Sequence, residues 1–174
     1  MALTYTAIAT VTVGSGGAST MEFTSIPVTY TDLVIKISAR DGRPTNKSNY
    51  IEIQFNNSTS TYNILDAGGT GSAAYASTND LGSNKPYAYG NAAGSTASTF
   101  GNSEIYIPNY AGSSAKSMSI DSVTENNGTE ARAVVSAAYW SGTSAITSIK
   151  LTSYGGNSFV QYTNATLYGI KNTV

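Results

Sequence analysis

The chain has 174 residues, and only 11% of them are charged, against roughly 25% in a typical soluble domain. Cysteine and histidine are both absent, which excludes disulfides, thiol nucleophiles, imidazole bases and the commonest zinc-binding side chains. A net charge of −1 without a basic excess argues against nucleic acid as a partner. No apolar run approaches the roughly 20 residues that span a bilayer, so we expect no membrane partner.

Alternation of apolar and polar residues with a period of two dominates the chain and is typical of half-buried β-strands. It begins in residues 4–13, where apolar residues alternate with threonine and no basic segment precedes them, so we expect a strand there and not a signal peptide. The inward faces are clearest in residues 31–40 (Leu33, Ile35, Ile37, Ala39), 50–55 (Ile51, Ile53, Phe55) and 103–110 (Ile105, Ile107). Further strands are predicted over residues 116–125, 130–140, 145–154 and 164–171.

Two of these strands carry an ambiguity. Residues 130–140 are apolar at both odd and even positions, and their alanine-rich part, residues 131–139, is the one candidate for a helix. Val134 and Val135 favour a strand, because β-branched side chains suit strands better than helices. In residues 145–154, Ile146 is out of phase with Ile149 and Leu151, which indicates a β-bulge.

Turn signals rich in glycine, asparagine and aspartate separate the strands, and no segment shows a convincing helical stripe. About eight to ten short strands joined by turns predict an all-β fold, a single-domain antiparallel β-sandwich of jelly-roll-like kind that comprises residues 1–174. An immunoglobulin-like sandwich is the alternative, although the chain lacks its Cys–Trp–Cys pattern.

Residues 67–101 form the longest stretch without a clear pattern and are rich in glycine, alanine, serine and threonine. Their segment from Gly69 to Ala74 matches the spacing of a dinucleotide-binding fingerprint, but no helix-forming sequence follows it. We therefore expect no cofactor, and we predict a long inter-strand loop with a short strand around Tyr87 to Tyr89. We further expect this arm to be ordered mainly by contact with a neighbouring subunit or the capsid.

Carboxylates are the remaining candidates for acid–base chemistry. Glu104, Asp121, Glu125 and Glu130 lie in the second half of the chain, and two carboxyl groups that face each other across a cleft can hydrolyse a glycoside. The alternative is that they are solvated strand and turn residues, as Glu52 is at an outward strand position. We favour this alternative and expect no catalytic residues.

The candidates for a calcium site lie in residues 39–50, where Asp41, Asn46 and Asn49 offer oxygen ligands. The spaced acidic residues of a dedicated calcium loop are missing, and Arg40, Arg43 and Lys47 oppose a cation. Turn chemistry explains these residues, so we expect no metal.

The thirteen tyrosines provide the strongest binding signal, because a tyrosine ring offers a large contact area with a polar tip. Most tyrosines in strands are expected to pack in the core or at its rim. We predict an interface role for Tyr75, Tyr87, Tyr89, Phe100 and Tyr110, in or near the long arm.

Four segments together resemble a known family: "FTSIPVTYTDLVIKISAR", "FGNSEIYIPNYAGSSAKSMSIDSVTENNGT", "AITSIKLTS" and "ATLYGIK". In this order, from Phe23 to Lys171, they are similar to small structural proteins in the virions of tailed bacteriophages. The resemblance implies an all-β protein that is either a free-standing virion component or a terminal module of a tail fibre. It implies no catalytic motif.

The resemblance leads us to expect a capsid decoration (cement) protein on the outer surface of the head, a homotrimer that bridges subunits of the major capsid protein. Low charge suits a subunit whose surface is largely buried in a symmetric lattice. No heptad-bearing shaft, as a long fibre needs, precedes the predicted sandwich. The alternative is a tail-fibre or adhesin module that recognises host glycans through tyrosine and tryptophan, and a carboxylate-based glycan hydrolase is a third possibility.

Overall fold

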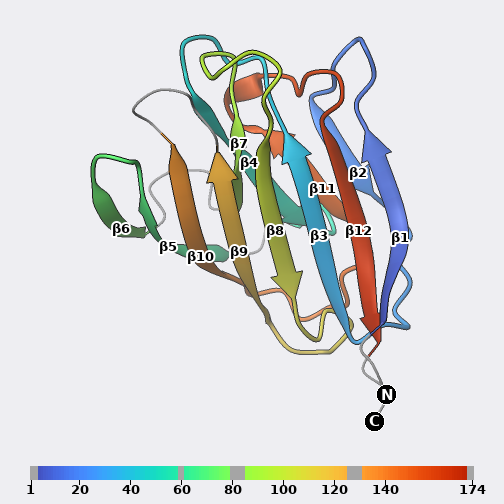
Figure 1. The fold of residues 1–174 in the computed structure, drawn as a ribbon. Helices are drawn as coiled ribbons and strands as arrows, with labels where there is room; N and C mark the ends of the chain where they lie inside the picture. The colour runs from blue at the N-terminus through green and yellow to red at the C-terminus, as the bar shows by residue number, and fades with distance from the viewer. Residues whose placement is uncertain (1–3, 59–60, 79–84, 125–130, 172–174) are drawn as a thin grey trace.

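The computed structural model describes residues 4–58, 61–78, 85–124 and 131–171, which form two antiparallel sheets packed face to face (Figure 1). The larger sheet contains, in spatial order, β1 (Thr4–Thr12), β12 (Asn164–Lys171), β3 (Asp32–Ala39), β8 (Gly101–Ile107), β9 (Lys116–Thr124), β10 (Arg132–Trp140), β5 (Tyr62–Gly69) and β6 (Ala74–Thr78). The smaller sheet contains β2 (Thr20–Phe23), β11 (Ile149–Ser153), β4 (Ser48–Phe55) and β7 (Tyr87–Asn91). One short 3₁₀ turn, η1 (Tyr154–Gly156), follows β11. The predicted β-sandwich is confirmed.

The core lies between the two sheets and is built from the inward residues that the alternation predicts. In the larger sheet, one row of paired residues runs through Leu167, Ile35, Ile105 and Ile120, all of which are buried. Leu151 and Ile53 are paired in the smaller sheet and are buried in the same hydrophobic cluster. Each such side chain contributes roughly 1.5–3 kcal/mol relative to full exposure, so this apolar layer is the main stabilising element.

An aromatic group at β4, β5 and β10 joins the two sheets. Phe55 of β4 packs edge-on against Trp140 of β10, with ring centroids 5.5 Å apart. Tyr62 of β5 stacks on Trp140 at 6.3 Å, and its hydroxyl accepts a hydrogen bond of 2.9 Å from the backbone N–H of Phe55. A strand of the smaller sheet is thereby connected by both apolar and polar contacts to two strands of the larger sheet.

Residues Arg132–Trp140 form strand β10, so the helix alternative for residues 131–139 does not apply. Even-numbered residues point inward, including Val134 and Trp140, while Val135 and Tyr139 point to solvent. Ile146 precedes β11 and is buried, and its N–H donates to the carbonyl of Tyr110 at 3.0 Å. The expected bulge is therefore not in β11, and the break in phase arises because Ile146 lies outside the strand.

The described residues contain more strands than the pattern predicts, because β2, β5 and β6 were not expected. β2 has only four residues, too few for a reliable alternation. β5 ends in two glycines and has the charged Asp66 on its inward face, and β6 has small residues around Tyr75 and little burial, so neither shows a sustained apolar alternation. The first strand, β1, also differs from expectation in being largely exposed, since it forms an edge of the larger sheet.

The predicted arm over residues 67–101 is partly confirmed and partly corrected. The short strand around Tyr87 to Tyr89 is present as β7, and every residue of β7 is buried. The segment after it wraps around Arg40, whose guanidinium donates to the carbonyls of Ala93, Ser95, Thr96 and Thr99 and to the hydroxyl of Ser95. The described part after β6 therefore has ordering contacts within its own domain, and the expected contact with a neighbouring subunit or the capsid stays a prediction.

Gly142 follows β10 and lies against the indole of Trp140. A β-carbon at residue 142 would lie 2.1 Å from Cζ2 of Trp140, so Gly142→Ala forces the indole out of its packed position. We expect the substitution to lower the free energy of unfolding by about 1–3 kcal/mol, measured by urea denaturation. Gly14→Ala is the matched control, because a β-carbon at residue 14 would have no heavy atom within 4 Å. Equal stability of the two variants would contradict this packing.

Candidate protein-binding face

The structure places the five predicted interface residues mostly inside the domain. Tyr87, Tyr89 and Tyr110 are buried, and Tyr75 and Phe100 are partly exposed. The Tyr87 hydroxyl donates to Oδ2 of Asp66 at 2.5 Å, and the Tyr110 hydroxyl donates to the carbonyl of Pro27. The rings of these buried tyrosines pack the core of this chain, as expected for most strand tyrosines.

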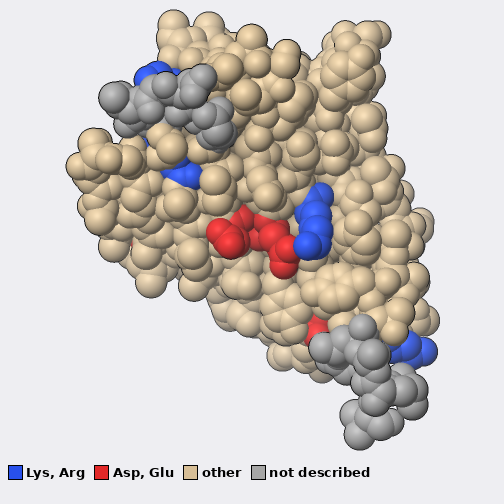
Figure 2. All heavy atoms as spheres, viewed as in Figure 1, with Lys and Arg blue, Asp and Glu red and all other residues tan. Residues whose placement is uncertain are grey.

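The outer face of the larger sheet carries exposed apolar side chains instead. Val123 of β9, Val135 of β10 and Leu65 of β5 are 50%, 61% and 52% exposed, and Tyr139 and Tyr106 are also exposed. Figure 2 shows this face, on which charged groups gather near the middle and the surface around them is largely uncharged. Contiguous apolar surface on a soluble domain is typical of a protein interaction site. We call the outward residues of β8, β9, β10, β5 and β6 the outer face.

Strand register explains why these apolar side chains form one patch. Val135 pairs with Ala67 of β5, and Ala67 pairs with Ala76 of β6. Two residues further along β10, Ala137 pairs with Leu65 of β5. Two residues before Val135, Ala133 pairs with Val123 of β9. The residues between the large side chains are mainly alanine. Their short side chains allow a partner's backbone and side chains to approach the sheet.

A hollow of about 330 Å³ over β8, β9 and β10 adjoins this patch and shares Val123 and Val135 with it. Its lining includes Glu104 and Asp121, which are directly opposite each other in adjacent strands. Lys36 of β3 binds Glu104 at 2.8 Å, which leaves one carboxylate of the pair without a described ion-pair partner. Since like charges directly opposite each other destabilise a sheet, this arrangement favours a partner that brings a positive charge.

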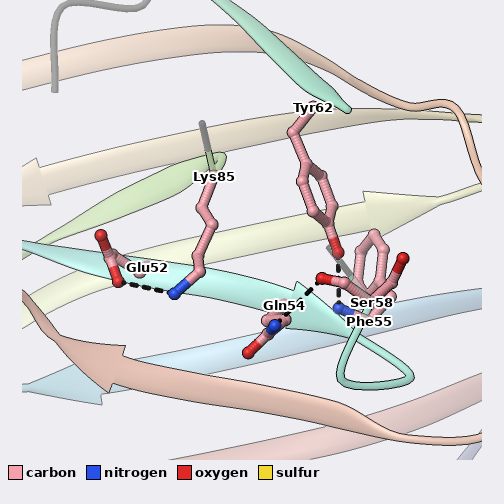
Figure 3. A network of polar contacts seen from close by, with 6 residues as sticks. All are labelled: Glu52, Gln54, Phe55, Ser58, Tyr62 and Lys85. Atoms are coloured by element: carbon pink, nitrogen blue, oxygen red, sulfur yellow. Dashed lines mark hydrogen bonds and ion pairs between the residues drawn. The ribbon is translucent and has the colours of Figure 1, made fainter. Parts of the chain in front are cut away.

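The other carboxylates that the sequence singled out are placed differently. Glu52 of β4 is buried and not solvated as predicted, and Lys85 forms an ion pair of 3.2 Å with it (Figure 3). Glu125 and Glu130 lie outside the described residues. Glu104 and Asp121 share an open face, where both are accessible to solvent, and we interpret them as binding and not as proton-transferring groups.

Two of the three suggested calcium ligands, Asp41 and Asn49, hydrogen-bond to each other, whereas Asn46 lies in the wall of a hollow away from the outer face. Asn49 is buried, and its Nδ2 donates to Oδ2 of Asp41, which also accepts a 2.7 Å hydrogen bond from Ser153. The Oδ1 atom of Asn49 accepts from Arg43, so the oxygen atoms of both residues already have protein partners. No group of three or more acidic residues in the described part of the chain is arranged to hold a metal ion. None of its helices is long and apolar enough to span a membrane.

Comparisons with protein families, with curated proteins and with solved structures find no match to this chain.

The outer face was not predicted from the sequence, although a signal for it exists. Residues 133–139 are apolar on both faces, and a strand that is buried on one side only then exposes Val135 and Tyr139. Because both faces of this strand are apolar, the sequence alone does not indicate which of them is outward.

The pairing of Glu104 with Asp121 has a measurable cost in stability. Asp121→Asn removes the like-charge repulsion and keeps the shape of the side chain, so we expect the free energy of unfolding to rise by about 0.2–1 kcal/mol at low salt. Urea denaturation at low and high ionic strength measures this gain, which should shrink with salt as screening increases. A loss of stability at low salt would show that Asp121 is held by an attractive contact.

Buried tyrosines should make the fold sensitive to alkali. Burial raises the pKa of Tyr87 and Tyr89 far above the ordinary value of 10.0, and the hydrogen bond to Asp66 raises the pKa of Tyr87 further. Below pH 10.0 both the folded and the unfolded chain keep these protons, whereas above it only the unfolded chain releases them. We expect the free energy of unfolding to fall as pH rises above 10.0, with tyrosinate absorbance from these residues appearing only on unfolding. Reversible ionisation of all thirteen tyrosines in the folded state would contradict this.

Proposed function

We propose that this chain is a structural protein of a bacteriophage virion, a capsid decoration protein that binds the exterior of the head through its outer face. The observation that carries the proposal is the patch of exposed apolar side chains around Val135 and Leu65 on the larger sheet. The resemblance of four ordered segments to phage virion proteins supports the same conclusion. The chain's role in this proposal is binding, without a chemical step.

The chemistry of the outer face indicates which kind of capsid surface it would bind. The patch requires an apolar surface on the capsid, because a charged surface would lose its hydration there without compensation. The hollow beside Asp121 accommodates a lysine or arginine of the capsid protein, whose charge would balance Asp121, since Lys36 already pairs with Glu104. The apolar contact then supplies most of the affinity, and the charge sets the orientation.

Stabilisation of the head follows from mass action. A protein that binds only the assembled shell lowers the free energy of that state and opposes its rupture. Few charges on the outer face are an advantage in this role, because symmetric neighbours in a lattice are close together and like charges would repel each other.

The proposal is tested with heads that lack this protein and with purified chain added back. We expect wild-type chain to bind these heads and restore their resistance to heat, and Val135→Asp or Leu65→Asp to weaken binding by about tenfold or more, since each places a charge in an apolar contact. Val28→Asp is the matched control, because Val28 is 54% exposed but lies in the loop between β2 and β3. Light scattering on the free chain measures the expected homotrimer.

Two results would overturn this assignment. Heads that lack the chain and yet keep full resistance to heat would exclude a cementing role. Equal binding of Val135→Asp, Leu65→Asp and Val28→Asp would show that the outer face is not the binding surface.

A further inference from the structure

A second hollow, of about 360 Å³, lies away from the outer face, where the loop between β3 and β4 meets β7, β10 and η1. Its wall contains three cationic side chains, Arg43, Lys47 and Arg132, and three tyrosines, Tyr50, Tyr89 and Tyr154. We call it the basic pocket. The basic pocket takes no part in the proposed capsid contact, because none of the residues that line it belongs to the outer face.

The charge of the basic pocket is unusual for this chain. Nine lysines and arginines are present in all, and three of them line this one hollow, whereas no carboxylate is among the described residues that line it. The ion pairs between described residues involve Lys36, Lys85 and Lys150, none of which lines the pocket. Three clustered positive charges repel each other unless an anion lies among them, so the pocket favours an anionic ligand.

Arg43 is held in place by neutral groups. Its Nη1 donates to Oδ1 of the buried Asn49 at 2.8 Å, and its guanidinium lies 5.9 Å from the centre of the Tyr154 ring. Asn49 is itself fixed, because its Nδ2 donates to Asp41 and to the carbonyl of Tyr154. The buried Asp41 therefore orients Arg43 through Asn49 without forming an ion pair with the guanidinium in the described structure.

Arg132, the first residue of β10, is also oriented by neutral groups. Its Nε donates to Oγ of Ser48 at 2.9 Å, and its guanidinium lies 5.4 Å from the centre of the Tyr89 ring. In the described hydrogen bonds each of the two arginines uses one side-chain donor, and an arginine has five. The remaining N–H groups provide the planar fork that binds a carboxylate or a phosphate.

The tyrosines and polar groups distinguish between these anions. The partly exposed Tyr50 ring contacts Tyr89 at 5.0 Å and Tyr154 at 5.7 Å, which gives the pocket a firm aromatic side. Aromatic faces pack against the C–H groups of sugar rings, and the amide of Asn46 and the hydroxyl of Thr45 in the wall can bind sugar hydroxyls. A nucleic acid strand would need a basic track that extends beyond one pocket, and the net charge of −1 does not favour such a polyanion.

We propose that the basic pocket binds an acidic sugar, a carboxylated unit of an anionic polysaccharide, with the carboxylate on the arginines and the sugar ring on Tyr50. The chain would then have a second binding activity directed to glycans, on residues separate from the outer face. The arginine forks select the carboxylate, and the aromatic side selects the ring to which it is attached.

The test uses the full chain and a matched pair of ligands, tetragalacturonate and its fully methyl-esterified form, in calorimetric titrations at low salt. The ester keeps the rings and loses the negative charges. We expect the acid to bind at least about tenfold more tightly than the ester, and Arg43→Gln and Arg132→Gln each to reduce its affinity by about tenfold or more. Lys150→Gln is the control, since Lys150 is paired with Glu22 and does not line the pocket.

Further variants separate the parts of the proposal. Arg43→Lys retains the charge and loses the fork, so it should bind less tightly than wild type. Tyr50→Ala should weaken binding of the sugar without changing any binding of inorganic phosphate. Unchanged thermal unfolding of the arginine variants shows that the fold is intact.

Three outcomes would overturn the assignment. They are equal affinity for the acid and its ester, an absence of binding to both, and tighter binding of inorganic phosphate or a single-stranded oligonucleotide than of the acidic sugar. None of them bears on the outer face, whose test uses other residues and another partner.

Discussion

The packing of the smaller sheet on the larger one is the constraint on which the rest of the structure depends. Side chains alternate along a strand, so a one-residue slip would move a whole apolar set to solvent. The buried row through Ile35, Ile105 and Ile120 fixes the faces of β3, β8 and β9 in this way. The outward positions follow from the inward ones, and Val135 is exposed because Val134 is in the core.

Scarcity of charge shapes the polar structure around this core. Hydroxyls, amides and backbone carbonyls carry out tasks that ion pairs perform in other proteins, as where Arg40 holds residues 93–99 through carbonyl groups. The few charges are also concentrated. Glu104 and Asp121 lie together on the outer face, and Arg43, Lys47 and Arg132 lie together in the basic pocket. The two hollows therefore differ in sign and suit different partners.

The two proposed activities are compatible because they use separate surfaces. A decoration protein that binds the head through a broad sheet face keeps its other surfaces free to meet the outside of the virion. The outer face has the flat and apolar character of a protein contact, whereas the basic pocket is small, cationic and partly aromatic. The core between the sheets positions the strands that carry both sites.

The sequence by itself determined most of the sheet. Its period-two alternation predicted eight of the strands and the inward faces of β3, β4 and β8, because strand geometry is a local property that side-chain order reveals. The sequence also led us to predict that Tyr87 and Tyr89 of β7 are interface residues, whereas the tertiary structure places them in the core. Only the tertiary structure decided which side of β10 is outward and which distant side chains meet. Arg43, Arg132 and Tyr154 are far apart in the chain, and they share one pocket because antiparallel pairing and sheet packing bring their strands' ends together.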